Sequence, residues 1–347
     1  MLENEISYYV DNNKDKWHSL FNQKEIKPPS ALLAENRDEI AIVVASSFLK
    51  EIAAQLKEMG FIYNQHFFNS GDIMMEIQQR HIQKMILKAL AIEDISGITA
   101  LEAKHTEIYG RYSEVQNITQ GMLSTYDALA IVYLILYHMH KYSLEQVRAL
   151  ELGSWTGLSS FLISKSINAF SETNSLFCVD SWGEYTAYAP YNAYSHYVDV
   201  LHVFRSLMKG LRVNQYIKVL FMPTDDAFAL LKNDLMDMAF IDADHTYEYV
   251  KRDIINAVQV LKPGSILFGH DFHHYDRELP PRELLQNHIH ERMLSYEGHD
   301  YFPGVLQAVY EIFGVTAHNV PFSSIWFKEI TVEDKKRIAL MVNDKKG

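Results

Sequence analysis

From Val147 to Gly157 the chain reads VRALELGSWTG. A short apolar run ends in Glu151, and Gly153 and Gly157 follow with three residues between them. This order is typical of a strand, a tight turn and the start of a helix. Glycines let the backbone approach a ligand closely, and free N–H groups at a helix start attract a carboxylate or a phosphate. The stretch therefore predicts a ligand-binding loop between a strand and a helix.

Strand and helix patterns alternate along the chain after about residue 115. The predicted strands cover residues 147–152, 175–179, 217–221, 236–241, 265–269 and 323–327. The predicted helices cover residues 123–140, 158–169, 194–211, 227–232, 247–261 and 305–313. This order implies a parallel sheet with helices on both faces. We therefore predict an α/β fold with a doubly wound, mostly parallel sheet that ends in an antiparallel strand.

The first 115 residues have a different pattern. Apolar residues recur at three- and four-residue spacing in residues 40–59 and again in residues 73–92, which predicts amphipathic helices. No catalytic constellation occurs in this part of the sequence. We therefore predict two domains, a helical accessory or oligomerisation domain at residues 1–115 and the α/β domain at residues 116–347.

Composition limits the partners and the compartment. The net charge of −12 argues against nucleic acid or an anionic membrane surface as the main partner. The single cysteine, Cys178, excludes an internal disulfide framework and is expected to be a small buried apolar residue. The N-terminal residues lack the pattern of a signal peptide. These features predict a cytoplasmic protein.

Polar residues end nearly every predicted strand: Glu151, Asp180, Asp225, Asp242 with Asp244 and His245, and His270 with Asp271. Ligands of such sheets bind beyond the carboxyl ends of the strands. The spacing E-x-G-x-x-x-G lacks the central glycine of the dinucleotide fingerprint, which disfavours a nicotinamide cofactor. Asp180 could accept hydrogen bonds from ribose hydroxyls or serve in a turn. Asp225 could face an adenine amino group or cap the next helix.

The motifs ELGSWTG, VDSWGE, PTDDAF, MAFIDADHTYEYVKRDI, LKPGSILFGHDF and YFPGVLQAVYEIF follow one another over residues 116–330. Together they resemble class I S-adenosylmethionine-dependent methyltransferases, in particular small-molecule O-methyltransferases of the macrolide-sugar and cephalosporin-hydroxylase-like group. The resemblance implies that S-adenosylmethionine is bound by Glu151, Gly153, Ser154, Trp155, Gly157, Asp180, Ser181, Trp182, Asp225 and Asp242. Within this set, the glycine loop would hold the methionine part, Asp180 the ribose and Asp225 the adenine.

The resemblance also implies the reaction chemistry. In metal-dependent relatives, carboxylates at two neighbouring strand ends bind a hard divalent cation, which lowers the pKa of a substrate hydroxyl. Asp242 and Asp271 match these positions, and His270 stands where relatives more often have an acid. The predicted metal ligands are thus Asp242, His270 and Asp271, for Mg²⁺ or a softer metal. His245 matches the histidine that acts as general base in sugar O-methyltransferases, so His245 and Asp242 are the predicted catalytic residues.

The predicted function is methyl transfer from S-adenosylmethionine to a hydroxyl of a small molecule, such as a sugar or a natural product. Two alternatives remain open: a metal-independent O- or N-methyltransferase, and a non-catalytic module that keeps the cofactor fold. Two inserts, at residues 184–197 and 273–301, are candidates for shaping the acceptor pocket. The N-terminal part makes a homo-oligomer plausible, and neither nucleic acid nor a membrane is an expected partner.

Overall fold

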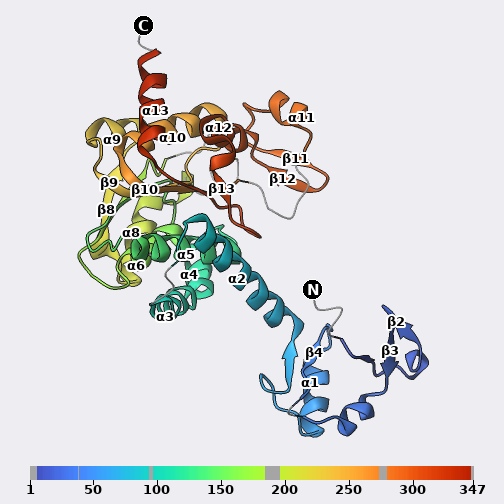
Figure 1. The fold of residues 1–347 in the computed structure, drawn as a ribbon. Coiled ribbons are helices and arrows are strands. Elements are labelled where there is room, and N and C mark those ends of the chain that lie inside the picture. Colours follow the sequence, from blue (N-terminus) through green and yellow to red (C-terminus); the bar gives the residue numbers. More distant parts are fainter. Residues whose placement is uncertain (1–5, 38, 94–96, 184–195, 273–279, 345–347) are drawn as a thin grey trace. The chain divides into compact units, whose positions relative to one another are not determined.

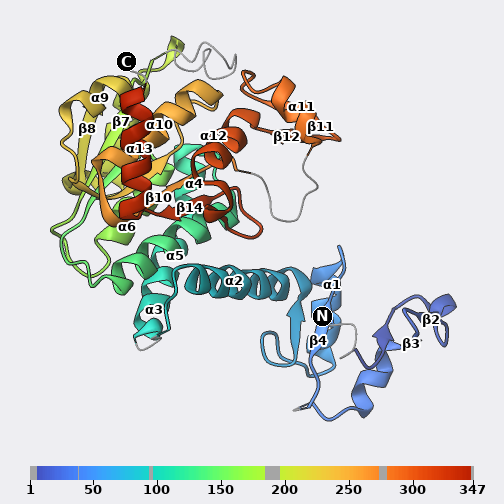
Figure 2. The same cartoon turned by 45° about the horizontal axis from the view of Figure 1, so that its top comes forward.

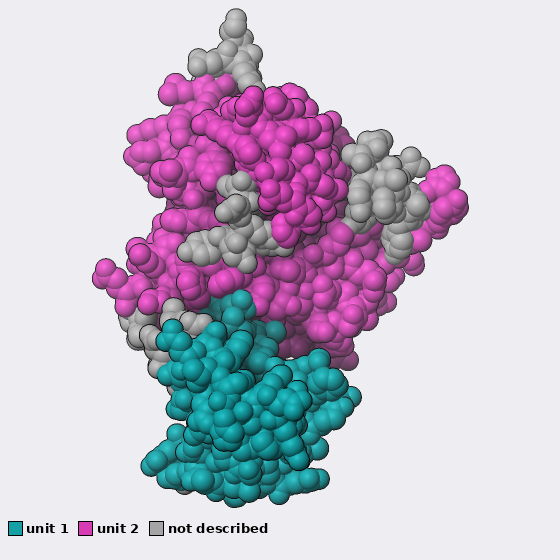
Figure 3. Space-filling view, turned by 90° about the vertical axis from the view of Figure 1, so that its right-hand side faces the viewer, with its two compact units in different colours: residues 1–78 teal, residues 79–347 magenta. Residues whose placement is uncertain are grey.

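The computed structural model describes residues 6–37, 39–93, 97–183, 196–272 and 280–344 (Figure 1). The chain divides into two compact units, residues 1–78 and 79–347, which are coloured separately in Figure 3. The sequence predicts a boundary near residue 115, whereas this division falls at residue 78. An accessory or oligomerisation role for the first 115 residues stays a prediction. Among the described helices, none combines the length and the apolar character needed to span a membrane.

The first unit mixes short strands with helices. Its elements are β1 (Tyr9–Val10), η1 (Lys14–Lys16), β2 (Leu20–Phe21), β3 (Lys24–Lys27), η2 (Pro29–Ala34), β4 (Ile42–Val44), α1 (Leu49–Glu58), β5 (Phe67–Asn69) and the start of α2 (Ser70–Ala89). A small core gathers Leu32, Val44, Leu56, Phe61 and Phe67.

The predicted helix at residues 40–59 is only half correct. Its second half is α1, but β4 occupies its first half and pairs in parallel with β5. The β-branched run Ile42–Val44 favours an extended chain, and the partner strand lies more than 20 residues later in the sequence. The predicted helix at residues 73–92 corresponds to α2, which ends at Ala89.

The second unit is built around a seven-stranded sheet of order β13-β14-β10-β9-β6-β7-β8. Its strands are β6 (Arg148–Leu152), β7 (Ser175–Asp180), β8 (Ile217–Phe221), β9 (Met236–Ile241), β10 (Leu261–Gly269), β13 (His318–Asn319) and β14 (Trp326–Glu329). Strands β6 to β10 are parallel, and β14 pairs antiparallel with both β10 and β13. The chain order reverses between β6 and β9, so the predicted doubly wound sheet with its antiparallel strand is confirmed. The reversal is the point where ligands bind in such folds.

Helices cover both faces of this sheet (Figures 1 and 2). The helices of this unit are α3 (Ile98–Tyr109), α4 (Tyr112–Thr119), α5 (Thr125–Lys141), α6 (Leu158–Ile167), α8 (Val200–Gly210), α9 (Thr224–Leu230), α10 (Tyr247–Val260), α11 (Arg282–Asn287), α12 (Pro303–Phe313) and α13 (Val332–Asp344), with the short 3₁₀ helices η3 (Asn214–Tyr216) and η4 (Gly314–Thr316). Of these, α11 lies beside the β11–β12 segment and not on the sheet (Figure 1). Neighbouring residues of one strand enter different cores: Ala149 packs with α5, α6 and α8, and Leu150 packs with α10 and α12. This alternation explains why the strands are apolar on both faces.

A hairpin of β11 (Leu294–Tyr296) and β12 (His299–Tyr301) precedes α12. It belongs to the second predicted insert, of which residues 280–301 are described and residues 273–279 are not. The first insert lies almost wholly outside the described residues, which resume at His196.

Gly153 allows the loop after β6 to lie close to the end of β9. Its φ is +86°, and a Cβ atom there would lie 2.1 Å from the carbonyl oxygen of Asp242. Gly298, in the hairpin turn, has a similar φ of +79°, but a Cβ atom there would meet nothing within 4 Å. An alanine would therefore have a strained backbone at both positions, but only at residue 153 would its Cβ atom collide with other atoms.

We predict that Gly153→Ala lowers the thermal midpoint much more than Gly298→Ala does. Both variants bear the left-handed backbone strain of about 1–2 kcal/mol, and only Gly153→Ala must also displace the end of β9. Thermal unfolding followed by circular dichroism measures the difference. Equal midpoints for the two variants would contradict the packing described for this loop.

Candidate active site

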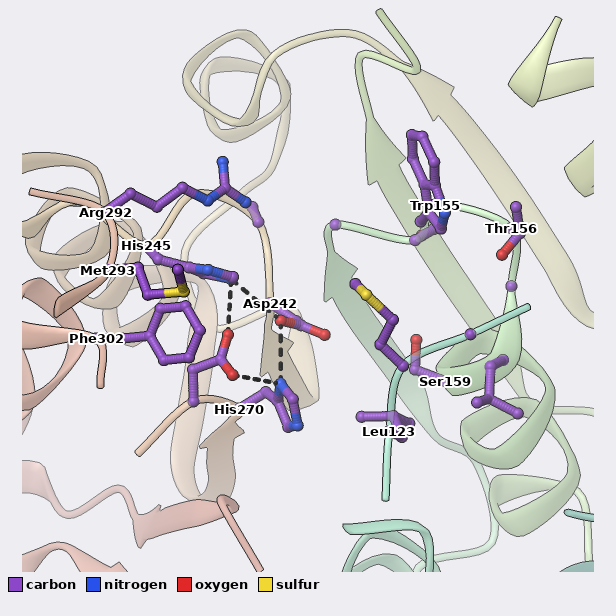
Figure 4. A pocket seen from close by; sticks show the side chains of 18 residues that line it. Leu123, Trp155, Thr156, Ser159, Asp242, His245, His270, Arg292, Met293 and Phe302 are labelled. Carbon is purple, nitrogen blue, oxygen red and sulfur yellow. Dashed lines mark ion pairs between the residues drawn. The ribbon is translucent and has the colours of Figure 1, made fainter. Parts of the chain in front are cut away.

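A pocket of about 280 Å³ opens at the carboxyl ends of β6, β9 and β10. Its lining comprises Gly121, Met122, Leu123, Gly153, Ser154, Trp155, Thr156, Gly157, Leu158, Ser159, Asp242, Ala243, His245, His270, Asp271, Arg292, Met293 and Phe302. In Figure 4, Trp155 and Thr156 lie on one side of this pocket, and His245 and His270 approach Asp242 on the other. The pocket therefore brings the glycine loop and the strand-end acids together, as the sequence predicts.

The carboxylate of Asp180 holds the glycine loop in shape. One oxygen accepts hydrogen bonds from the backbone N–H groups of Ser154 (3.0 Å) and Trp155 (2.9 Å), and the other accepts from the N–H of Trp182 (2.7 Å). The indole of Trp182 donates to the carbonyl oxygen of Trp155 at 2.7 Å. Both tryptophans have a φ of 42°, a left-handed conformation that is strained for such side chains and needs support of this kind.

Glu151 lies beneath the same loop and is fully buried. Its Oε2 accepts hydrogen bonds from the hydroxyls of Ser154 and Ser160 and from the thiol of Cys178 at 3.2 Å. Burial raises the pKa of the Glu151 carboxyl, although these hydroxyls oppose the shift. Cys178 is buried, as predicted, and its thiol is one of the donors that Glu151 uses.

The predicted cofactor residues divide into two groups in the structure. Those that line the pocket are Gly153, Ser154, Trp155, Gly157 and Asp242. Those that do not line it are Glu151, Asp180, Ser181, Trp182 and Asp225. In the second group, Glu151, Asp180 and Trp182 form hydrogen bonds with residues of the glycine loop. Ser181 is exposed beside them.

Asp225 is placed apart from the pocket. It lies in the first turn of α9, and its carboxylate forms an ion pair with Arg252 of α10 at 2.8 Å. The structure thus does not bring Asp225 to the pocket lining, and contact with an adenine stays a prediction.

The acids and histidines after β9 and β10 form one cluster. Nε2 of His245 lies 2.9 Å from Asp271 and 3.5 Å from Asp242. Nδ1 of His270 lies 3.1 Å from Asp271 and 3.6 Å from Asp242. All four side chains are largely buried, with between 11% and 21% of their surface exposed. Asp271 has a φ of 59°, so the strand end is strained where it delivers this carboxylate.

Mutual charge shifts the pKa values of this cluster. Burial opposes the charged form of His245, but the Asp271 and Asp242 carboxylates outweigh burial and raise the pKa of His245 to about 9. The same two carboxylates, with Asp127, raise the pKa of His270 well above its usual value. Burial likewise opposes the charge of Asp271, but the two histidines hold its pKa well below the usual range.

The cluster also fits a divalent cation. Ligand atoms of Asp242, His245 and Asp271 all lie within 4.8 Å of one another. Two carboxylate oxygens and an imidazole nitrogen suit Mn²⁺, Fe²⁺ or Zn²⁺ and leave Mg²⁺ less favoured. The structure therefore places His245, the predicted base, as close to the two carboxylates as His270, the predicted ligand. Which imidazole completes the ligand set stays a prediction.

The pocket lining includes several residues that the sequence motifs do not predict. Residues 121–123 precede α5, and Arg292, Met293 and Phe302 come from the segment around the hairpin. The Phe302 ring meets the His245 imidazole edge to face, with centroids 4.9 Å apart. Asp127, which contacts His270 from α5, was missed as well. The spacing of Ser124 and Asp127 is that of a capping box and could have marked the helix start.

The raised pKa of His245 predicts how the stability of the fold depends on pH when a chelator keeps the protein free of metal. A histidine whose folded pKa is raised to about 9 stabilises the fold below its unfolded pKa near 6.5, and this contribution is lost as the pH rises towards 9. The thermal midpoint of the wild type should therefore fall between pH 6.5 and 9, and that of His245→Asn should fall less. Equal slopes for both proteins would contradict the ion pairs described here.

A comparison with protein families agrees with the resemblance seen in the sequence motifs. Residues 150–272 match the model of a family described as a methyltransferase domain. A search of curated proteins finds no match. The fold is similar to that of solved methyltransferases, and the TM-scores and identities are low.

Three of these structures illustrate the range. The O-methyltransferase TomG from Streptomyces achromogenes, in complex with S-adenosylmethionine, is 13% identical with a TM-score of 0.42, covering 65% of this chain and 90% of its own. The O-methyltransferase NovP is 14% identical with a TM-score of 0.43, and the match covers 69% of this chain and 100% of NovP. The Podospora anserina methyltransferase PaMTH1, bound to S-adenosylhomocysteine, is 14% identical with a TM-score of 0.40, and the match covers 63% of this chain and 87% of PaMTH1.

The family match spans the glycine loop, both strand-end acid motifs and the strands between them. It agrees with the order of the sheet and with the motifs that resemble this class in sequence. Residues 150–272 are thus similar to a methyltransferase domain, and they include the centre of the doubly wound sheet.

Proposed function

We propose that the protein transfers the methyl group of S-adenosylmethionine to a hydroxyl of a small molecule, and that Asp242 and Asp271 hold a divalent cation beside the acceptor. The observation that carries this proposal is the shared pocket. The glycine loop and the cluster of two carboxylates and two imidazoles line the same cavity. A cofactor bound at the loop would lie next to groups that can bind and deprotonate a hydroxyl.

In this reaction the acceptor oxygen forms a bond to the methyl carbon as the carbon–sulfur bond breaks. The products are S-adenosylhomocysteine, the methyl ether and a proton. A divalent cation held by Asp242 and Asp271 would supply positive charge that lowers the pKa of the acceptor hydroxyl. In-line transfer depends chiefly on positioning, which the pocket walls provide.

We assign the released proton to His245. Its Nε2 faces the carboxylates, and its Nδ1 is buried without a hydrogen-bond partner among the described residues. With its pKa raised to about 9, the ring is protonated at pH 7 while the carboxylates lack another cation. The neutral form, which can accept a proton, therefore becomes more populated as the pH rises.

The pocket dimensions and the protein charge support a small acceptor. Met293 and Phe302 offer apolar surface, and Arg292 is the one lysine or arginine among the described lining residues. The net charge of −12 supports a neutral or small acceptor over nucleic acid or an anionic membrane. A cytoplasmic location and a homo-oligomeric state remain part of this proposal.

One observation favours a metal-independent variant of the same reaction. His270 lies among carboxylates that raise its pKa, so its imidazolium can balance their charge without a metal. Exhaustive chelation separates the two variants. Methyl transfer that is unaffected by chelation would select the metal-independent one.

We predict that Asp242→Asn and Asp271→Asn each weaken Mn²⁺ binding by at least ~10-fold in titration calorimetry. Asp225→Asn is the matched control, because Asp225 carries the same charge but pairs with Arg252 away from the pocket. The control should bind Mn²⁺ as the wild type does. Unchanged affinity in both cluster variants would refute a metal site at these carboxylates.

We also predict that His245→Asn lowers the rate of S-adenosylhomocysteine release from a panel of hydroxyl acceptors by roughly 10²-fold or more, as expected for loss of a general base. With Mn²⁺ present, the wild-type rate should rise with pH as His245 loses its proton. In the variant, this rise should be absent. A wild-type rate that is flat over the same range would show that His245 does not take the proton.

A further inference from the structure

His270 is held from two sides. Its Nδ1 faces Asp271 and Asp242 in the pocket, at 3.1 Å and 3.6 Å. Its Nε2 lies 3.3 Å from Oδ2 of Asp127, which is 143 residues away in the sequence. The ring therefore connects the pocket to the first turn of α5.

Asp127 is fixed by four further hydrogen bonds. Its Oδ2 accepts from the N–H of Ser124 at 2.8 Å, and its Oδ1 accepts from the N–H and the hydroxyl of Ser324 at 2.8 Å and 3.2 Å. Its own N–H donates to the hydroxyl of Ser124 at 3.2 Å. Only 4% of the side chain is exposed. A carboxylate held in this way cannot turn to follow the ring, so the ring must follow the carboxylate.

Capping alone does not account for this carboxylate. A capping box needs one acceptor oxygen for the N–H of the cap residue, and Oδ2 of Asp127 accepts that N–H from Ser124. The bonds to Ser324 and the contact with His270 lie outside the capping box. Both carboxylate oxygens of Asp127 accept hydrogen bonds from backbone N–H groups, Oδ2 from Ser124 and Oδ1 from Ser324. The ring nitrogen of His270 that faces Oδ2 therefore acts as a donor and carries a proton.

We propose that Asp127 is a positioning residue of the active site, which holds the proton on Nε2 of His270 and thereby directs Nδ1 of that ring at Asp242 and Asp271. The inference rests on the proposed function, which makes these two carboxylates the reacting end of the pocket. Histidines that bind metals commonly donate their other N–H to a carboxylate, and this partner sets the orientation of the ring.

The same contact links the ring to the wall of the pocket. Residues 121–123 line the pocket immediately before the cap residue of α5, and the capping box fixes the start of that helix. Asp127 thus joins this wall, the end of β10 and the segment before β14 through one side chain.

The test compares Asp127→Asn with Ser124→Ala in the full-length chain. Ser124→Ala removes the serine half of the capping box and leaves the contact between Asp127 and His270 in place. Asp127→Asn keeps the shape, but in either orientation of the amide the charge-assisted bond to His270 is lost. Nuclear magnetic resonance of ¹⁵N-histidine-labelled protein, with His270→Ala for assignment, reports the Nε2 proton directly.

We expect a slowly exchanging Nε2 proton on His270 in the wild type and in Ser124→Ala, and its loss or a large shift in Asp127→Asn. In calorimetry with Mn²⁺ alone, Asp127→Asn should weaken binding by about 10–100-fold, and Ser124→Ala should not. In a His270→Ala background, Asp127→Asn should have no further effect, because the two residues act as one unit.

The inference is overturned if the wild type carries no proton on Nε2 of His270, a reading that needs no variant to fold. It is also overturned if Asp127→Asn and Ser124→Ala change both readouts alike, since the role of Asp127 would then be capping alone. A wild type that binds no Mn²⁺ but shows the protected Nε2 proton would contradict the metal in the proposed function and uphold the role of Asp127.

Discussion

Three carboxylates, those of Asp127, Asp242 and Asp271, and the imidazoles of His245 and His270 share one largely buried cluster at the carboxyl ends of β9 and β10. Burying an unpaired charge is costly, so this concentration of acids is possible only because each carboxylate faces a group that can be positively charged. This balance between negative and positive charge constrains the rest of the site. A ligand that binds here must preserve the balance by supplying a cation, a proton or a hydrogen-bond donor.

The order of strands at the centre of the sheet places these groups beside the glycine loop. β6 and β9 are adjacent, and Gly153 lets the loop after β6 press against the carbonyl of Asp242. Asp180 then fixes the loop through the backbone N–H groups of Ser154 and Trp155, and it accepts a third hydrogen bond from the N–H of Trp182. The glycine loop and the acid–histidine cluster thereby lie close together, as the proposed methyl transfer between two bound molecules would require.

Local patterns predicted the strands well, because a buried parallel strand is a short apolar run with clear ends. Residues 217–221 and 236–241 match β8 and β9 residue for residue. The same rule failed at β4, whose Ile42–Val44 also fits a helical spacing and is made a strand by pairing with β5. Spacing alone could not decide between the two structures there.

Residues of the candidate site could be predicted where a strand end places them in the pocket lining, as with Asp242, His245 and Asp271. Asp225 follows a strand as well, but it lies on α9 and pairs with Arg252, a contact that no local pattern reveals. Asp127 has a recognisable capping spacing, yet its partner His270 is 143 residues away, and only the packing of α5 against the sheet brings them together. Contacts of this kind depend on tertiary structure.

A crystal structure of the protein with S-adenosylhomocysteine and Mn²⁺, with anomalous diffraction to locate the metal, tests most directly whether cofactor and cation share this pocket. We expect S-adenosylhomocysteine against residues 153–157 and one manganese peak between Asp242 and Asp271, coordinated by at least one of the two imidazoles. An anomalous peak away from these carboxylates, or a cofactor bound outside this pocket, would contradict this expectation.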